Sequence, residues 1–170
     1  MNTARAAVTE CAGDRSGAVY VEFLIAFMPL LLMFSGLLQL GMAQIAAIVT
    51  QHAAVTAARA AMVILPDNPI YYDTGVDQIG GQRSAEIQLA AQKTLSAIDP
   101  SPQVQVRFVG APGGNTPVTS VGRFDVLHAQ VLYQYPCRIP IGNVLVCGPG
   151  ASKLLTAESD MPNQGANENY

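Results

Sequence analysis

The stretch that decides the fold covers residues 22–43 and reads EFLIAFMPLLLMFSGLLQLGMA. It begins with Glu22, after which no Asp, Glu, Lys or Arg appears before Arg59. An apolar helix of about 20 residues is long enough to cross a hydrocarbon core about 30 Å thick. Residues 23–43 have that length, so we predict a transmembrane helix there. The run is too long for the apolar core of an ordinary secretory signal.

The carboxylate of Glu22 stands at the mouth of this predicted span. A charged side chain at the centre of a membrane helix costs roughly 2.5–3.5 kcal/mol, and less near the interface. Because a chain normally avoids that cost, Glu22 is a candidate functional residue.

The helical pattern continues beyond the predicted span. Residues 44–63 are rich in alanine, the strongest helix former, and Pro66 and Pro69 then end the helix. We therefore predict one long helix over residues 18–65, half of it in lipid. Its second half is expected to pack one face on the rest of the protein, because apolar and larger side chains recur there near helical spacing: Ile45, Ile48, Val49, His52, Val55 and Arg59.

The rest of the chain reads as a small α+β domain. A turn-rich linker over residues 66–83 leads to a second, short helix over residues 84–98, whose apolar face contains Ile87, Ala91, Leu95 and Ile98. Alternating apolar and polar residues predict strands at 104–108, 123–135 and 153–159. The predicted fold class is α+β: a long N-terminal helix, a second short helix and a small antiparallel β-sheet over residues 84–162. Residues 163–170 form a polar, flexible tail.

Composition argues against several classes of function. Of 170 residues only 12% are charged, the net charge is −3, and the basic residues are scattered singly, so nucleic acid is not an expected partner. No nucleotide-binding or nucleophile motif is present, and His52 and His128 lie in different elements without ligand spacing. We expect no enzyme activity, no catalytic residues, no metal and no cofactor.

Cys137 and Cys147 close a loop of about ten residues, while Cys11 lies near the start of the chain. A disulfide over such a loop contributes on the order of 3 kcal/mol. It persists only in an oxidising compartment. The alternative is a pair of free thiols in a reducing compartment.

The junction before the apolar run has a distinctive order of residues. It reads Arg15-Ser16-Gly17-Ala18-Val19-Tyr20-Val21-Glu22-Phe23. A glycine, four residues, a glutamate and an aromatic residue before an apolar helix resemble the cleavage junction of type IV prepilins. With Pro29-Leu30-Leu31-Leu32 following, the junction is similar to that of the TadE-like family, minor pseudopilins of the Flp, or tight adherence, pilus system. The resemblance in motif covers residues 15–41, and beyond them it is architectural.

The resemblance implies a processing step and an assembly role. Gly17 and Ala18 would flank the bond cut by a prepilin peptidase acting from the cytoplasmic side, and residues 1–17 would be the leader. Gly17 suits this role because it lets the backbone lie extended in a protease cleft. Glu22, beside Phe23, would pair with the new N-terminal ammonium group of Ala18 on a neighbouring subunit. Alternatively, Glu22 only reaches the interface and ends the span.

The resemblance also implies a location and partners. The chain would be a single-pass protein of the bacterial inner membrane, with its N-terminus in the cytoplasm and its domain in the periplasm. Its partners would be the prepilin peptidase, other pilins or pseudopilins, the inner-membrane assembly platform and membrane lipid. The main rival is an unprocessed, signal-anchored periplasmic binding or adaptor domain. A membrane-anchored enzyme would require a cluster of polar side chains that the sequence does not show.

Overall fold

A computed structural model describes residues 16–163 and Gly165. Most of the predicted leader, residues 1–17, and most of the predicted tail, residues 163–170, lie outside the described residues. The described chain has the predicted α+β architecture: a long N-terminal helix, a shorter helix and a three-stranded antiparallel sheet. The prediction of the fold class is therefore confirmed.

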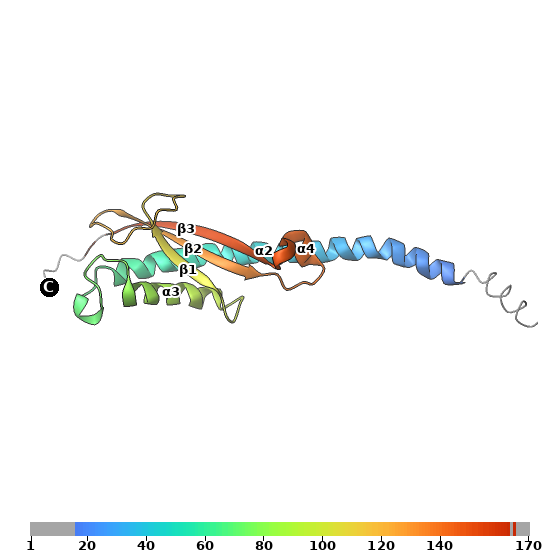
Figure 1. Ribbon diagram of the computed structural model, residues 1–170, viewed down its shortest axis with the longest axis horizontal. Coiled ribbons are helices and arrows are strands. Elements are labelled where there is room, and N and C mark those ends of the chain that lie inside the picture. The colour runs from blue at the N-terminus through green and yellow to red at the C-terminus, as the bar shows by residue number, and fades with distance from the viewer. Residues whose placement is uncertain (1–15, 164, 166–170) are drawn as a thin grey trace, which may run out of the picture.

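The long helix α2 (Ser16–Ile64) forms the axis of the molecule (Figure 1). Its 49 residues make a rod about 74 Å long at about 1.5 Å per residue. Pro29 lies inside the helix without ending it, which a membrane helix can tolerate. The sheet and the second helix pack along the C-terminal half of this rod, and the N-terminal half stands apart from them.

The second helix α3 (Gly81–Leu95) begins three residues before the predicted start at Ser84. The carboxylate of Asp73 accepts a hydrogen bond of 2.9 Å from the backbone N–H of Gln82, one of the amides left free in the first turn. The Ser84 hydroxyl instead donates to the carbonyl of Gly81. The side chain that bonds a free amide in the first turn of α3 is therefore Asp73, and the sequence had not predicted this role for it.

The sheet has the order β1-β2-β3, and both pairs are antiparallel. Its strands are β1 (Val104–Val109), β2 (Val126–Pro136) and β3 (Ser152–Pro162), each close to a predicted range. Val131 on β2 pairs with Val106 on β1 and with Ala157 on β3. Short elements not predicted are η1 (Pro69–Tyr71), α4 (Gly142–Val146) and η2 (Gly148–Gly150).

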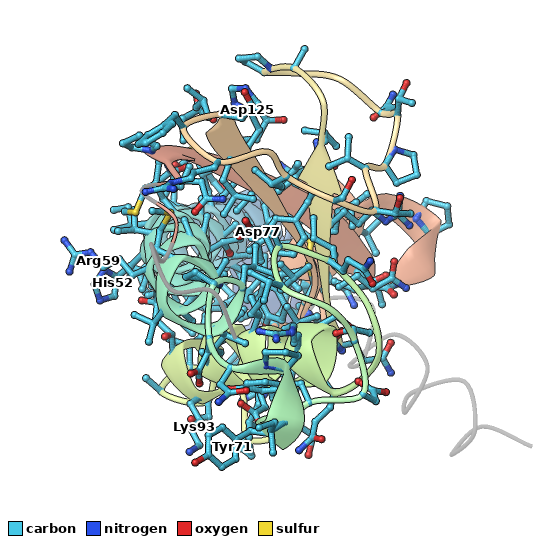
Figure 2. The ribbon with its side chains drawn as sticks, turned by 90° about the vertical axis from the view of Figure 1, so that its left-hand side faces the viewer. His52, Arg59, Tyr71, Asp77, Lys93 and Asp125 are labelled. Atoms are coloured by element: carbon cyan, nitrogen blue, oxygen red, sulfur yellow. A yellow bond between two sulfur atoms is a disulfide. The ribbon has the colours of Figure 1, made fainter. Side chains whose placement is uncertain are left out.

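The core lies between the sheet, α2 and α3, and α2 contributes to it almost only alanine. The buried alanines of α2 are Ala43, Ala46, Ala53, Ala54, Ala57, Ala58 and Ala61. Of the six larger residues with helical spacing, Ile45, Ile48, His52 and Arg59 are exposed, and Figure 2 shows His52 and Arg59 pointing out from the rod. Val49 and Val55 are partly buried, and Val49 packs against the core. One face of this half of α2 packs on the domain as predicted, but the residues that form the face were mostly predicted wrongly. Small side chains line it because they allow α3 and the sheet to approach the axis of α2 closely.

Arg83 on α3 is buried and secures the C-terminal end of α2. Its guanidinium donates to the carbonyls of Ile64, Leu65 (3.1 Å) and Asp67 (2.9 Å). It also lies 4.2 Å from the centre of the Tyr72 ring. Carbonyls at the end of a helix have no partner within the helix. Arg83 adds its donors to the backbone N–H groups of Asp67 and Asp77, which also bond the carbonyls of Ile64 and Leu65.

We predict that Arg83→Ala lowers the free energy of unfolding by about 2–4 kcal/mol, because it removes a buried side chain and its hydrogen bonds to the carbonyls of Ile64, Leu65 and Asp67. Thermal unfolding of the full chain in detergent, followed by circular dichroism, measures the change. Arg107→Ala is the control, since Arg107 is exposed on β1 and bonds only Gln105 among the described residues. Equal losses in both variants would contradict the role given to Arg83.

Candidate functional site

The helix α2 divides into two parts between Phe34 and Ser35. We call residues 17–34 the free helix and residues 35–64 the covered helix. In the free helix nearly every described side chain is exposed, although most are large and apolar. Burial begins at Ser35 and recurs at Gln39 and Ala43, four residues apart on one face. The domain therefore covers one half of the rod and leaves the other half bare (Figure 1).

The free helix belongs to a candidate membrane span. Within the part of the chain that the structure describes, one helix is long and apolar enough to cross a bilayer, and it is α2, over Val19–Ile64. Most of its large apolar side chains before Ser35 are left exposed by the described residues. The structure is therefore compatible with a single-pass membrane protein.

The residues predicted for processing and assembly all lie at the start of the free helix. Gly17 and Ala18 are in the first turn of α2, and a Cβ added at Gly17 would meet no other described residue within 4 Å, apart from the backbone of its own helix. Glu22 is exposed and forms no ion pair with another described residue. Phe23 is exposed as well, and its ring stacks on Phe27 with centroids 5.4 Å apart. One uncovered segment thus brings the four predicted residues together.

The two cysteines lie elsewhere, where the free helix meets the domain. The structure joins Cys137 and Cys147 in a disulfide, with Cα atoms 6.5 Å apart. We call residues 137–147 the disulfide loop; it contains α4 and lies beside α2 at the start of the covered helix (Figure 1). The cysteines therefore shape a separate feature from the predicted assembly residues.

The disulfide loop touches α2 through a backbone contact and a buried amide. Gly142 packs directly on the carbonyl of Ser35, so closely that a Cβ at position 142 would overlap the carbonyl oxygen. Gln39 is fully buried; its side-chain oxygen accepts from the N–H of Ile139 (3.0 Å) and its nitrogen donates to the Tyr135 hydroxyl (3.4 Å). Sequence reasoning missed this contact. The available signal was Ser35 and Gln39, two polar residues four apart within an otherwise apolar run.

A second polar contact ties the disulfide loop to the turn after α3. Asp99 is buried and accepts from the Tyr133 hydroxyl (3.1 Å) and from the Arg138 guanidinium (3.2 Å). Burial, and then the hydrogen bond and charge of Asp99, raise the pKa of Tyr133 well above its usual range. Arg138 is the residue after Cys137, so this contact fixes the first turn of the loop.

One other pair of side chains could carry chemistry, on the outer face of the sheet. His128 Nδ1 lies 2.7 Å from a carboxylate oxygen of Asp160, because the two residues pair across β2 and β3. Between residues 16 and 163, no hydrogen bond joins His128 to a hydroxyl group. No group of three metal-ligating residues occurs in the same range. This pair therefore forms neither a nucleophile–base arrangement nor a metal site.

We predict that Gly142→Ala weakens the contact of the disulfide loop with α2, since forcing atoms into a filled space costs about 1–3 kcal/mol. The loop then opens more often, and trypsin should cut after Arg138 about tenfold faster or more. Mass spectrometry of reduced digests follows the cleavage. Gly41→Ala is the matched control, because a Cβ added there would meet no described residue outside its own helix within 4 Å. An unchanged rate in Gly142→Ala would show that the contact is loose.

We also predict that Tyr133 makes the protein sensitive to alkali. Its pKa is raised in the folded state, so the unfolded state releases this proton first, and stability is present below about pH 10 and falls as pH rises further. Between the unfolded and folded pKa values the loss is about 1.4 kcal/mol per pH unit. Thermal unfolding from pH 8 to pH 11, a range of about three units, should show this slope in the parent and a smaller slope in Tyr133→Phe. Tyr71→Phe, in an exposed turn, is the control; equal slopes in all three proteins would contradict the assignment.

Comparisons with protein-family models, with curated proteins and with solved structures found no match to this chain. The resemblance to TadE-like pseudopilins therefore rests on residues 15–41 and on the order of the elements.

Proposed function

We propose that this chain is a TadE-like minor pseudopilin of a Flp, or tight adherence, pilus system, which assembles through its N-terminal helix. The single observation that carries the proposal is the free helix with its junction. Gly17, Ala18, Glu22 and Phe23 stand at the start of an apolar segment that the protein's own domain leaves uncovered. A role in assembly gives this bare apolar surface a partner in lipid and then in a helix bundle.

Glu22 gives such a bundle a means of setting its register. Cleavage between Gly17 and Ala18 would leave an ammonium group on Ala18, about 6 Å along the helix axis from Glu22 at about 1.5 Å per residue. A charge in an apolar bundle is tolerable only if it is paired. In the described residues Glu22 has no such partner, which leaves it available to the Ala18 ammonium group of a neighbouring subunit.

The proposed orientation places the N-terminus in the cytoplasm and the domain in the periplasm of a bacterial inner membrane. A disulfide persists in an oxidising compartment such as the periplasm, and the structure has one between Cys137 and Cys147. The proposed partners are a prepilin peptidase, the other pilins or pseudopilins, and the inner-membrane assembly platform. The alternative is a signal-anchored adaptor domain that is never processed, in which α2 serves only as an anchor.

The N-terminus of the protein in native membranes distinguishes the two functions. We expect a mature chain that begins at Ala18 in wild-type cells and at Met1 in cells that lack prepilin peptidase. Gly17→Val should block cleavage, because a β-branched side chain restricts the extended backbone at the cut. Gly41→Ala, in the same helix but outside the junction, should leave it unchanged. Intact mass and N-terminal sequencing give the answer.

Glu22→Gln separates assembly from processing. We expect this variant to be cleaved but to lose cross-linking to neighbouring pilins in the membrane, since an uncharged amide pairs poorly with an ammonium group. A chain that begins at Met1 in every strain would overturn the pseudopilin proposal and leave the anchored adaptor.

A further inference from the structure

We propose that the disulfide loop is a second membrane contact, which inserts its apolar side chains into the interfacial layer of an anionic phospholipid bilayer beside α2. The proposal goes beyond pseudopilin assembly. It depends on the free helix lying in lipid and does not depend on cleavage of the leader.

The loop presents an apolar surface that the described part of the chain does not cover. The exposed fractions are 41% for Ile141, 69% for Val144 and 63% for Leu145. Large apolar side chains gathered at one end of a domain mark a site of contact with protein or membrane.

The loop lies at the level where a bilayer surface is expected. At about 1.5 Å per residue, Glu22 at the mouth of the span and Gln39 at the loop are about 26 Å apart, slightly less than a hydrocarbon core of about 30 Å. The loop meets α2 at the far end of that length, since Gly142 packs on Ser35 and a Cβ at Gly36 would lie 3.1 Å from Leu145. A bilayer that buries the free helix therefore reaches the loop.

The charge of this end of the domain fits an anionic lipid surface. No Asp or Glu occurs in residues 126–157, which include the loop and the strand ends on either side of it. Arg138 is half-exposed although it pairs with the buried Asp99, and Lys153 is exposed at the start of β3. Apolar residues next to exposed cations are the composition of segments that lie in a membrane interface.

The loop is held rigidly enough to present these side chains. The disulfide closes the loop, Gln39 accepts a hydrogen bond from the N–H of Ile139, and Asp99 accepts one from the Arg138 guanidinium. A surface that is already ordered loses little conformational entropy when it binds. This rigidity also fixes the depth of α2, because the loop cannot enter lipid without the helix beside it.

The absence of tryptophan from the chain allows a direct test. Three full-length variants, Val144→Trp, Leu30→Trp and Val63→Trp, each carry one tryptophan at a site that is exposed in the structure. The variants are reconstituted in vesicles of phosphatidylglycerol and phosphatidylethanolamine that contain phospholipids brominated at defined depths. We expect Val144→Trp to lose at least half of its fluorescence to bromines near the headgroups. Leu30→Trp should be quenched by deep bromines, and Val63→Trp by neither.

The charge is tested by adding Lys153→Gln to Val144→Trp, which should reduce quenching to the level found in vesicles of phosphatidylcholine alone.

An unquenched Val144→Trp beside a quenched Leu30→Trp overturns the proposal and leaves the pseudopilin function standing. An unquenched Leu30→Trp shows that the free helix is not in lipid, and both proposals then fail. Fluorescence of Val144→Trp that escapes the bromines but changes with the protein-to-lipid ratio assigns the loop to a second copy and also overturns lipid contact.

Discussion

The contact between Gln39 and the disulfide loop determines where along α2 the domain begins to cover the helix. Before Ser35 the described side chains of α2 are nearly all exposed, and from Ser35 onward one face of the helix is buried. A buried amide costs free energy unless its hydrogen bonds are made, and Gln39 makes them with Ile139 and Tyr135. These two partners lie on one segment of the chain. The Gln39 amide therefore makes both hydrogen bonds only when the domain sits at one position along α2.

The rest of the domain follows from this fixed position. The alanines of the covered helix offer a narrow surface without long side chains, on which α3 and the sheet pack closely. At the far end Arg83 donates to the carbonyl of Ile64, the last residue of α2, and to those of Leu65 and Asp67 in the turn after it, so the helix is secured at both ends of the covered part. The domain thus resists sliding or tilting on the rod, and a force on the domain would be transmitted to the free helix.

Much of this fold could be predicted from the sequence. The length of the apolar run predicts the long helix, and the alternation in Val104, Val106 and Phe108 predicts a strand that the structure contains. The packing face of the covered helix was misjudged, because alanine is weakly apolar and spacing favoured Ile45 and Ile48 instead. The helix α4 was missed because five residues are too few to show a period.

The candidate site divides in the same way. Gly17 and Glu22 stand out through the order of residues at one junction, which is a local property of the sequence. The contacts of Gln39 and Asp99 were not predictable, because they join residues that are far apart in the chain: Gln39 with Ile139, and Asp99 with Arg138. Long-range polar contacts of this kind depend on how strands and loops meet, which local pattern does not contain.

On the proposed function, lipid contact and assembly compete for the same part of the molecule. Glu22 and Gln39 are about 26 Å apart along α2 at about 1.5 Å per residue, close to the thickness of the hydrocarbon core. In a bilayer, Glu22 therefore lies at one surface while the disulfide loop lies at the other. To pair with a neighbouring ammonium group inside a bundle, Glu22 must leave its surface, and the rigid connection moves the loop by the same distance. The apolar side chains of Ile141, Val144 and Leu145 would then lose their contact with lipid. They would require contact with a protein surface in its place. Release of a subunit from the membrane would therefore depend on the presence of a neighbouring subunit.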